Sequence, residues 1–234
     1  MYLFDVDGTL TPSRRVMEPP FKEWFLRFVE QHPVAFVSGS DSVKTIEQVG
    51  QDLFDAVEYS FNCAGNAVYA KGQLIYQSEW QPDDELMKHL SYELLASKYP
   101  HRYGNHVEIR TGMVNFSTVG RDCTVGDRLG YFIWDVENHE REQLCSRLKA
   151  QLPHLTFEVG GDISIDIFPN GCDKSQVLKY LPDQELDFFG DRMEPGGNDY
   201  TLSQAILDNQ QGRCYNISNW LETERILKQL CPNV

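Results

Sequence analysis

The sequence predicts an α/β fold, a parallel sheet covered by helices, into which an α+β unit with an antiparallel sheet is inserted. Two observations predict it. Short apolar, strand-like runs alternate with helical patterns at both ends of the 234-residue chain, and this rhythm is typical of a parallel sheet. Between them the pattern changes to hairpins separated by helices, which favours an antiparallel sheet. We therefore expect a core of residues 1–77 and 171–234, with an inserted domain at 78–170.

The first part of the core is expected to run strand, helix, strand, helix. The expected elements are strands at 2–7 and 34–40 and helices at 19–31 and 42–54. The first helix begins with two prolines and carries aromatic residues at helical spacing, which indicates one buried face. Either Ser40 or Asp41 is a suitable N-cap for the second helix, which we expect to be continuous.

The rest of the chain is assigned by the same patterns. We expect a hairpin at 67–77 with a Lys-Gly turn, a helix at 82–99, two strands within 106–120 around a Thr-Gly turn, a helix at 139–152 and a second hairpin at 155–169 turning at Gly160-Gly161. The first rhythm then returns. We expect a helix at 173–181, a strand at 186–191, a helix at 201–209, a strand at 213–218 and a last helix at 220–230.

The composition is that of a folded protein with an acidic surface, with 41% hydrophobic residues and a formal net charge of −14. This charge argues against nucleic acid or an anionic membrane as the main partner, although a small anionic substrate needs only local basic residues. No apolar stretch is long enough to span a bilayer, and no signal-peptide pattern precedes the first strand. The six cysteines form no CxxC pair. We expect reduced thiols and a cytoplasmic protein.

Polar side chains follow three of the expected core strands at the point where each strand ends. Asp5 and Asp7 end the first strand, Ser38 the second, and Asp191 the strand "LDFFG". Ligands of parallel α/β sheets bind beyond the carboxyl ends of the strands, and carboxylate oxygens gathered there suit Mg²⁺. A carboxylate can also attack phosphorus. Lys174, at the start of a helix, provides a cation for a phosphoryl group.

These motifs resemble those of the haloacid dehalogenase superfamily. The matching stretches are "DVDGTLTPSR", "VSGSD", the pair Asp173-Lys174 and "FFGDRMEPGGND". The pattern DxDGT is a fairly specific signature of that superfamily, and the later acidic motif lies at a plausible distance from it. The resemblance implies a Rossmann-like haloacid dehalogenase core with the inserted unit acting as a cap.

The same resemblance implies roles for individual residues. Asp5 would be the nucleophile that forms an aspartyl-phosphate, and Asp7 the general acid and base. Mg²⁺ would be held by Asp5, the backbone carbonyl of Asp7, and Asp191. The other residues implied to contribute are Ser38 and Lys174, which would bind the phosphoryl group, and Asp199, which would be a supporting or metal-linked acid.

Polar residues in the inserted domain alternate with apolar ones. Glu108 and Arg110 share one face of the strand "HVEIRTG", and Ser164 and Asp166 share one face of "GDISIDIFP". A half-buried strand with one solvated face explains this pattern without any ligand. Three arginines in this acidic chain nevertheless fall within one short stretch, and the planar guanidinium suits a phosphate. These arginines are Arg110, Arg121 and Arg128.

The inserted segments "HVEIRTGMVNFSTVGRDCTVGDR" and "GGDISIDIFPNGCDK" closely resemble the cap of eukaryotic-type phosphomannomutases, and the opening "DVDGTLTPSR" matches that family through Arg14. The match runs over most of the chain in the same order. The resemblance implies that Arg14 and the three cap arginines hold the sugar phosphate. It also implies that Ser164 and Asp166 hold the sugar hydroxyls.

The family resemblance implies a phosphomannomutase that interconverts mannose 6-phosphate and mannose 1-phosphate. It also implies an Mg²⁺ cofactor, a hexose 1,6-bisphosphate intermediate and activator, a role in GDP-mannose supply, and a homodimer formed through the cap. Two other hypotheses remain open on the residues alone. One is a sugar-phosphate phosphatase, in which water attacks the aspartyl-phosphate. The other is a catalytically silent sugar-phosphate binder, which the intact set of acids and lysine makes improbable.

Overall fold

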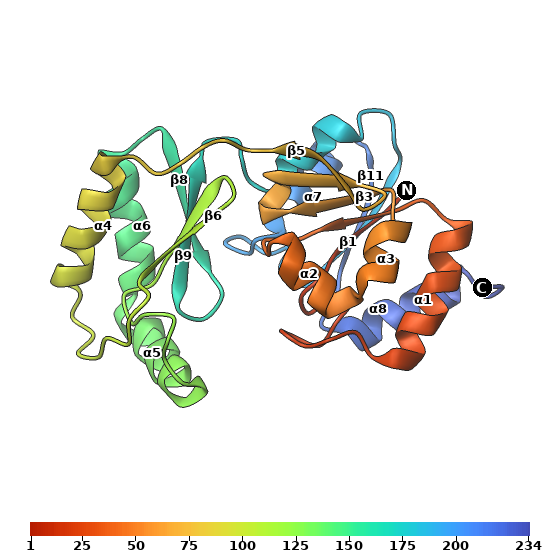
Figure 1. Ribbon diagram of the computed structural model, residues 1–234. Helices are drawn as coiled ribbons and strands as arrows, with labels where there is room; N and C mark the ends of the chain where they lie inside the picture. Colours follow the sequence, from red (N-terminus) through yellow and green to blue (C-terminus); the bar gives the residue numbers. More distant parts are fainter. The chain divides into compact units, whose positions relative to one another are not determined.

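The computed structural model describes residues 1–234 and divides them into two compact units (Figure 1). The core unit consists of Met1–Ser78 and Cys172–Val234, and the cap unit of Glu79–Gly171. The chain passes between the two units at two points, and Asn66 forms a hydrogen bond at each of them. Its backbone oxygen accepts a hydrogen bond from Ser78 N at 2.8 Å, and its Nδ2 donates to Cys172 O at 3.3 Å. Asn66 therefore joins the ends of the two core segments at the place where the cap unit is inserted.

The core unit contains a seven-stranded sheet in the order β11-β10-β1-β2-β3-β4-β5. The strands are β1 (Tyr2–Asp5), β2 (Val34–Val37), β3 (Tyr59–Asn62), β4 (Ala67–Ala70), β5 (Gln73–Gln77), β10 (Leu186–Gly190) and β11 (Gly212–Asn216). The pairs from β11 to β3 are parallel, and the β4–β5 hairpin is antiparallel. The central strands are apolar on both faces because helices cover both. The predicted α/β fold is confirmed.

Helices lie on both faces of this sheet (Figure 1). They are α1 (Pro19–Gln31), α2 (Ser42–Val49), α3 (Gln51–Ala56), the 3₁₀ helix η2 (Lys174–Tyr180), α7 (Tyr200–Asp208) and α8 (Trp220–Leu230), with a short 3₁₀ turn η1 (Cys63–Gly65) after β3. One apolar cluster joins α1, α3 and α8 to the sheet. Another joins η2 and α7 to the opposite face. The aromatic residues of α1 are buried, as their spacing predicted.

One local prediction in the core is wrong. The single helix expected at 42–54 is two helices, because Gly50 adopts φ +92° and ends α2. The helix expected at 173–181 is present over Lys174–Tyr180 and is of the 3₁₀ type. The start of α2 is as expected, since the side chain of Asp41 accepts a hydrogen bond from Lys44 N at 2.8 Å.

The cap unit contains a four-stranded antiparallel sheet in the order β6-β7-β9-β8. Its elements are α4 (Asp84–Ala96), β6 (Val107–Arg110), β7 (Met113–Phe116), α5 (Val125–Asn138), α6 (Glu140–Gln151), β8 (Leu155–Gly160) and β9 (Ser164–Pro169). Leucines of α4 and α6 pack on the apolar face of the sheet. The other face carries the polar residues of alternating strand positions, so the predicted α+β unit is confirmed.

The helix α5 was missed by the sequence analysis. Its N-terminus is a capping box between Thr124 and Asp127. Only Tyr131 and Asp135 of this helix are buried, and most of its apolar side chains are exposed. Its apolar residues Val125, Leu129, Phe132 and Val136 nevertheless recur at helical spacing, so the sequence does contain the pattern of an amphipathic helix. The hairpin turn expected at Gly160-Gly161 lies one residue later, over residues 161–163. None of the helices combines the length and apolar character needed to cross a bilayer.

Candidate active site

The predicted core residues lie at the carboxyl ends of three neighbouring strands. Asp5 is the last residue of β1, Ser38 follows β2, and Asp191 follows β10. Because the strand order is β10-β1-β2, these ends are adjacent at one edge of the sheet. This edge is where a parallel α/β sheet binds its ligands.

A buried lysine links two of the acids. Nζ of Lys174 lies 2.5 Å from Oδ1 of Asp5 and 2.6 Å from Oδ1 of Asp199. All three side chains are at least nine-tenths buried. Asp199 also accepts a hydrogen bond from the backbone N–H of Arg192 at 3.2 Å, so both of its oxygens are engaged. Asp199 therefore fixes the lysine, which in turn donates to Asp5.

Asp5, Asp191 and Asp199 form an acidic cluster, with one oxygen from each lying within 4.8 Å of the others. Burial raises the pKa of Asp5 to about 8 although Lys174 opposes it, and the charges of Asp199 and Asp191 raise it further. Burial, with the charge of Asp199, raises the pKa of Asp191 to about 6. Neighbouring carboxyl groups resist ionising at the same time, and a divalent cation stabilises their charged forms. Carboxylate oxygens are also hard ligands. The donor set therefore fits Mg²⁺.

Gly8 brings the chain close to this cluster. Its φ is +91°, and a Cβ at this position would lie 2.5 Å from Oδ2 of Asp191. A side chain there would both strain the backbone and displace the carboxylate. The structure thus requires a glycine after the two aspartates for two reasons, the backbone conformation and the space that Asp191 occupies.

The side chain of Asp7 lies outside the acidic cluster. Its Oδ1 accepts hydrogen bonds from the backbone N–H of Arg14 and, at 2.9 Å, from Nε2 of Gln48. Its Oδ2 has only the hydroxyl of Ser13, at 3.5 Å. Sequence reasoning missed Gln48, which lies 41 residues away. No local pattern marks it, because its position on α2 becomes informative only when the sheet is assembled.

Ser38 and Arg14 occupy contrasting positions. Ser38 is buried, and its Oγ accepts a hydrogen bond from Ser40 N at 3.0 Å. Arg14 is exposed with φ +60°, so its backbone N–H binds Asp7 while its side chain remains at the surface. The structure thus joins Arg14 to the site through its main chain.

A second polar group lies on the open face of the cap sheet. Glu108, Asn115 and Asp166 are direct cross-strand neighbours on β6, β7 and β9. Asn115 Nδ2 donates to Asp166 Oδ1 at 2.5 Å, and Asn115 Oδ1 accepts from Arg121. Sequence alternation placed Glu108 and Asp166 on strand faces. The structure shows that Asn115 joins them.

Glu108 is bonded to two of the predicted arginines. Arg110 donates to both of its oxygens, at 3.1 and 3.2 Å, and Arg121 forms an ion pair with it. Burial alone would raise the pKa of Glu108, but the hydrogen bonds and charges of Arg110 and Arg121 hold it below its usual value. Burial raises the pKa of Asp166, against the hydrogen bond from Asn115. The group is therefore one coupled electrostatic unit.

The other predicted cap residues lie near this group. Arg128, on α5, is half-buried. Burial and the charge of Arg110 lower the pKa of Arg121, Glu108 opposes them, and Arg128 adds to them. Ser164 is buried at the start of β9, two residues before Asp166 and on the same face. The structure thus brings the three cap arginines within electrostatic range of one another.

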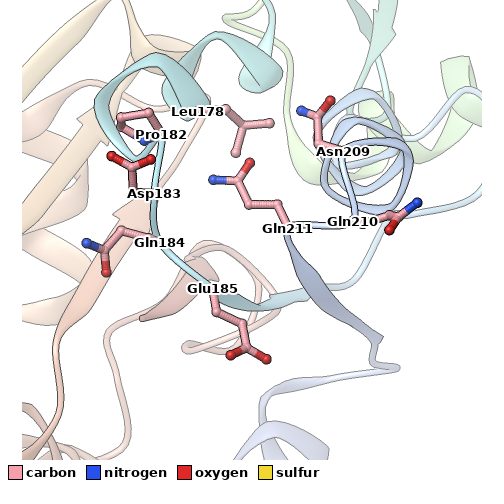
Figure 2. Close-up of a pocket in the computed structure, with 8 residues that line it drawn as sticks. All are labelled: Leu178, Pro182, Asp183, Gln184, Glu185, Asn209, Gln210 and Gln211. Atoms are coloured by element: carbon pink, nitrogen blue, oxygen red, sulfur yellow. The ribbon is translucent and has the colours of Figure 1, made fainter.

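An open pocket of about 570 Å³ lies elsewhere in the core unit. Figure 2 shows its polar lining, which comes from the segments before β10 and β11 and so from the amino ends of these strands. None of the predicted site residues contributes to it. This pocket is therefore distinct from the acidic cluster at the carboxyl ends.

Comparisons with known proteins show the family of this chain. The family model of eukaryotic phosphomannomutase matches residues 21–232. A phosphomannomutase of Oryza sativa subsp. indica is 37% identical over 212 residues, which covers 87% of this chain and 86% of that protein. A phosphomannomutase of Saccharomyces cerevisiae is 35% identical over 241 residues, covering 98% of this chain and 93% of that protein.

Solved structures show the same fold at low sequence identity. The trehalose-6-phosphate phosphatase C-terminal domain of C. albicans superposes with a TM-score of 0.69 at 13% identity, covering 100% of this chain and 92% of that one. A haloacid dehalogenase-like hydrolase from Bacteroides thetaiotaomicron superposes with a TM-score of 0.56 at 14% identity, covering 87% and 84%. The haloacid dehalogenase-like fold is thus confirmed. With the family match over most of its length, the chain belongs to the eukaryotic phosphomannomutase family and is an enzyme of that family.

Proposed function

We propose that this enzyme is an Mg²⁺-dependent phosphomannomutase that interconverts mannose 6-phosphate and mannose 1-phosphate. The observation that carries the proposal is that a chain of this family holds two groups suited to phosphate. One is the carboxylate–lysine group of the core unit, and the other is the arginine-rich group on the cap sheet. A mutase needs two such groups, because its bisphosphate intermediate carries one reacting and one non-reacting phosphate.

In the core unit Asp5 attacks phosphorus and forms an aspartyl-phosphate. Lys174 lies 2.5 Å from Asp5 and orients this nucleophile, and both it and Ser38 stabilise the transferring group. Mg²⁺, which Asp5, Asp191 and the backbone carbonyl of Asp7 would hold, supplies charge that offsets the repulsion between carboxylate and phosphate. Asp199 keeps Lys174 in place.

Asp7 carries the protons of the reaction. As Asp5 takes the phosphoryl group, the P–O bond breaks and its electron pair remains on the sugar oxygen, which receives a proton from Asp7. In the second half-reaction Asp7 takes a proton from the attacking sugar hydroxyl. Its carboxylate is exposed enough to reach substrate and is held by neighbouring N–H groups.

The cap group is proposed to bind the part of the substrate that does not react. Arg110, Arg121 and Arg128, with Arg14 of the core unit, bind the non-reacting phosphate, and Ser164 and Asp166 bind sugar hydroxyls. A hexose 1,6-bisphosphate intermediate then turns and presents its other phosphate to Asp5. A bisphosphate supplied as activator starts the cycle by phosphorylating the enzyme.

The test is a product analysis. The purified protein is mixed with mannose 1-phosphate, Mg²⁺ and a trace of glucose 1,6-bisphosphate, and mannose 6-phosphate is expected with little free phosphate. Dominant release of free phosphate from every sugar phosphate would instead establish a phosphatase, the alternative that shares the core machinery. The variant Asp5→Asn is expected to abolish either activity, and retained turnover would rule out Asp5 as the nucleophile.

We further propose that the enzyme is a cytoplasmic homodimer, associates through its cap unit, and acts in GDP-mannose supply. Support for the interface comes from α5, whose exposed face carries a row of apolar side chains. These are Val125, Leu129, Phe132, Ile133 and Val136. Light scattering is expected to give twice the chain mass of 27.0 kDa. The variant Leu129→Glu is expected to give the monomer mass, and an unchanged dimer would place the interface elsewhere.

A further inference from the structure

Gln48 lies at the end of α2 and is bonded to the loop that follows β1. Its Nε2 donates hydrogen bonds to Asp7 Oδ1 at 2.9 Å and to Thr11 Oγ1 at 3.1 Å. Its backbone oxygen accepts from Met17 N at 2.7 Å. The side chain is 3% exposed, so water does not compete for these bonds.

The other end of this amide is unsatisfied. Oε1 of Gln48 is buried and has no hydrogen-bond partner. A buried acceptor without a partner costs stability, whereas an apolar side chain of the same length would avoid that cost. Both amide hydrogens, in contrast, are used, and one of them binds Asp7. The benefit of a glutamine at this position therefore lies in its two donors.

The hydrogen bonds around Asp7 differ between its two oxygens. Oδ1 accepts two N–H donors, from Arg14 and Gln48. Oδ2 has only the Ser13 hydroxyl, at the long distance of 3.5 Å. The two donors on Oδ1 fix the rotation of the carboxyl group. They leave Oδ2 as the oxygen that is available to exchange a proton with a ligand.

We infer that Gln48 is a positioning residue for the proton transfer by Asp7, holding Oδ1 so that Oδ2 faces the reacting sugar oxygen. The inference rests on the proposed function, which makes Asp7 the general acid and base. In the forward step the Oδ2–H bond breaks as the sugar oxygen takes the proton, and the P–O bond breaks as Asp5 bonds to phosphorus. In the reverse step the sugar hydroxyl returns its proton to Oδ2 as its oxygen attacks phosphorus.

A comparison of substrates with a poor and a good leaving group distinguishes this positioning role from a general structural role. A sugar alkoxide is strongly basic and needs a proton as it leaves, whereas p-nitrophenolate is weakly basic and leaves without one. Loss of the Gln48 donor should therefore slow phosphoryl transfer to Asp5 from glucose 1,6-bisphosphate, whose leaving group is a sugar alkoxide, much more than from p-nitrophenyl phosphate. Misfolding or displacement of Asp5 would slow both alike.

The experiment measures the first phosphoryl transfer with enzyme in excess over substrate and with Mg²⁺ present. The wild type is compared with Gln48→Met, which keeps the side-chain length and removes both donors. The matched control is Gln51→Met, because Gln51 is exposed and its amide binds only Asp55, at 2.8 Å. For Gln48→Met we expect a loss of about 30-fold with glucose 1,6-bisphosphate and less than about threefold with p-nitrophenyl phosphate.

The ratio of the two rates is taken within one preparation, so it does not depend on the fraction of active protein. Gln51→Met is expected to keep the wild-type ratio. An unchanged ratio in Gln48→Met, whether both rates fall or neither does, would overturn the role of Gln48. Failure of the wild type to transfer phosphate from either compound would instead overturn the proposed function, and with it the inference.

Discussion

Asp5 and Lys174 are 169 residues apart in the chain, yet their side chains form a buried ion pair with an N–O distance of 2.5 Å. The two residues come from the two segments that flank the cap unit. Lys174 also pairs with Asp199, so one cation neutralises charge on two buried acids. Removal of either end of this bridge should thus affect stability as well as activity.

The variant Lys174→Met tests this bridge. It leaves Asp5 and Asp199 buried and close together without a cation, so we expect the free energy of unfolding to fall by about 3–5 kcal/mol and activity to be lost. Urea unfolding measures the change. In the control Lys228→Met the lost pair is the exposed i,i+4 contact with Glu224, and we expect less than about 0.5 kcal/mol. Equal effects of the two variants would contradict a buried bridge.

Metal binding should release protons near neutral pH. Burial raises the pKa of Asp5 to about 8 and that of Asp191 to about 6, so at pH 7 the metal-free site retains protons that Mg²⁺ must displace. We expect the apparent affinity for Mg²⁺ to rise between pH 6 and pH 8. Calorimetry at pH 7 in buffers of different ionisation enthalpy should show net proton release. A binding enthalpy that is independent of the buffer would count against protonated acids.

The same shift determines how the stability of the metal-free protein depends on pH. The folded pKa of Asp5 lies above its usual value of 3.8, so between these values the folded state binds more protons than the unfolded state. The contribution of Asp5 to stability should therefore decrease from about pH 4 to pH 8. Burial lowers the pKa of Lys174, but the charges of Asp199 and Asp5 outweigh burial and raise it, so Lys174 stays charged and adds no slope there. We expect Asp5→Asn to flatten this decrease in thermal unfolding scans, and an unchanged slope would refute the assignment.

The carboxylate of Glu108, which pairs with Arg110 and Arg121 in the cap unit, should weaken phosphate binding. Glu108 occupies N–H donors of Arg110 and Arg121 and carries an opposing charge. In Glu108→Gln we expect KM for mannose 1-phosphate to fall roughly fivefold, for about 1 kcal/mol of lost repulsion. We expect kcat to fall as well, because the intermediate must leave the arginines in order to turn. The control Glu58→Gln alters only the exposed pair with Lys71 and should change neither constant. A raised KM would show that Glu108 instead orients the arginines.

Alanine variants of two glycines distinguish the effect of backbone strain from the effect of a steric clash. Gly8→Ala adds a Cβ at φ +91° that would lie 2.5 Å from Asp191 Oδ2. Gly171→Ala adds one at φ +78° with no atom within 4 Å. Both should lose about 1–2 kcal/mol of stability through strain, but only Gly8→Ala should also weaken Mg²⁺ binding, measured by titration. Equal Mg²⁺ affinity in both variants would mean that Asp191 can move without cost.

Much of the fold follows from local patterns. The alternation of apolar strands with helices predicted the core sheet, and the hairpins predicted the cap sheet, because both depend on the burial of neighbouring positions. The break at Gly50 and the helix α5 were not predicted. Gly50 acts through a backbone conformation that the helical pattern hides. The helix α5 could have been predicted, because Val125, Leu129, Phe132 and Val136 recur at helical spacing although they are exposed.

The residues of the candidate site likewise include some that the sequence predicts and some that it does not. Asp5, Asp7, Ser38 and Asp191 could be predicted because the ends of parallel strands meet at one edge. Gln48 and Asn115 could not, because each acquires its role through one side-chain hydrogen bond to a residue far away in the sequence. Such bonds depend on the assembled packing of elements and leave no periodic trace.

Asn66 holds both chain crossings, one through its backbone oxygen and one through its side chain. The core unit is therefore opened at a single point, and no ladder of its sheet is interrupted by what is inserted there. Insertions at such a point are tolerated because they strain neither flanking segment. In evolution the inserted module can thus be lengthened, shortened or exchanged as a cassette while Asp5 and Asp191 keep their register. The cap unit can vary in this way without any change to the core sheet that carries Asp5 and Asp191.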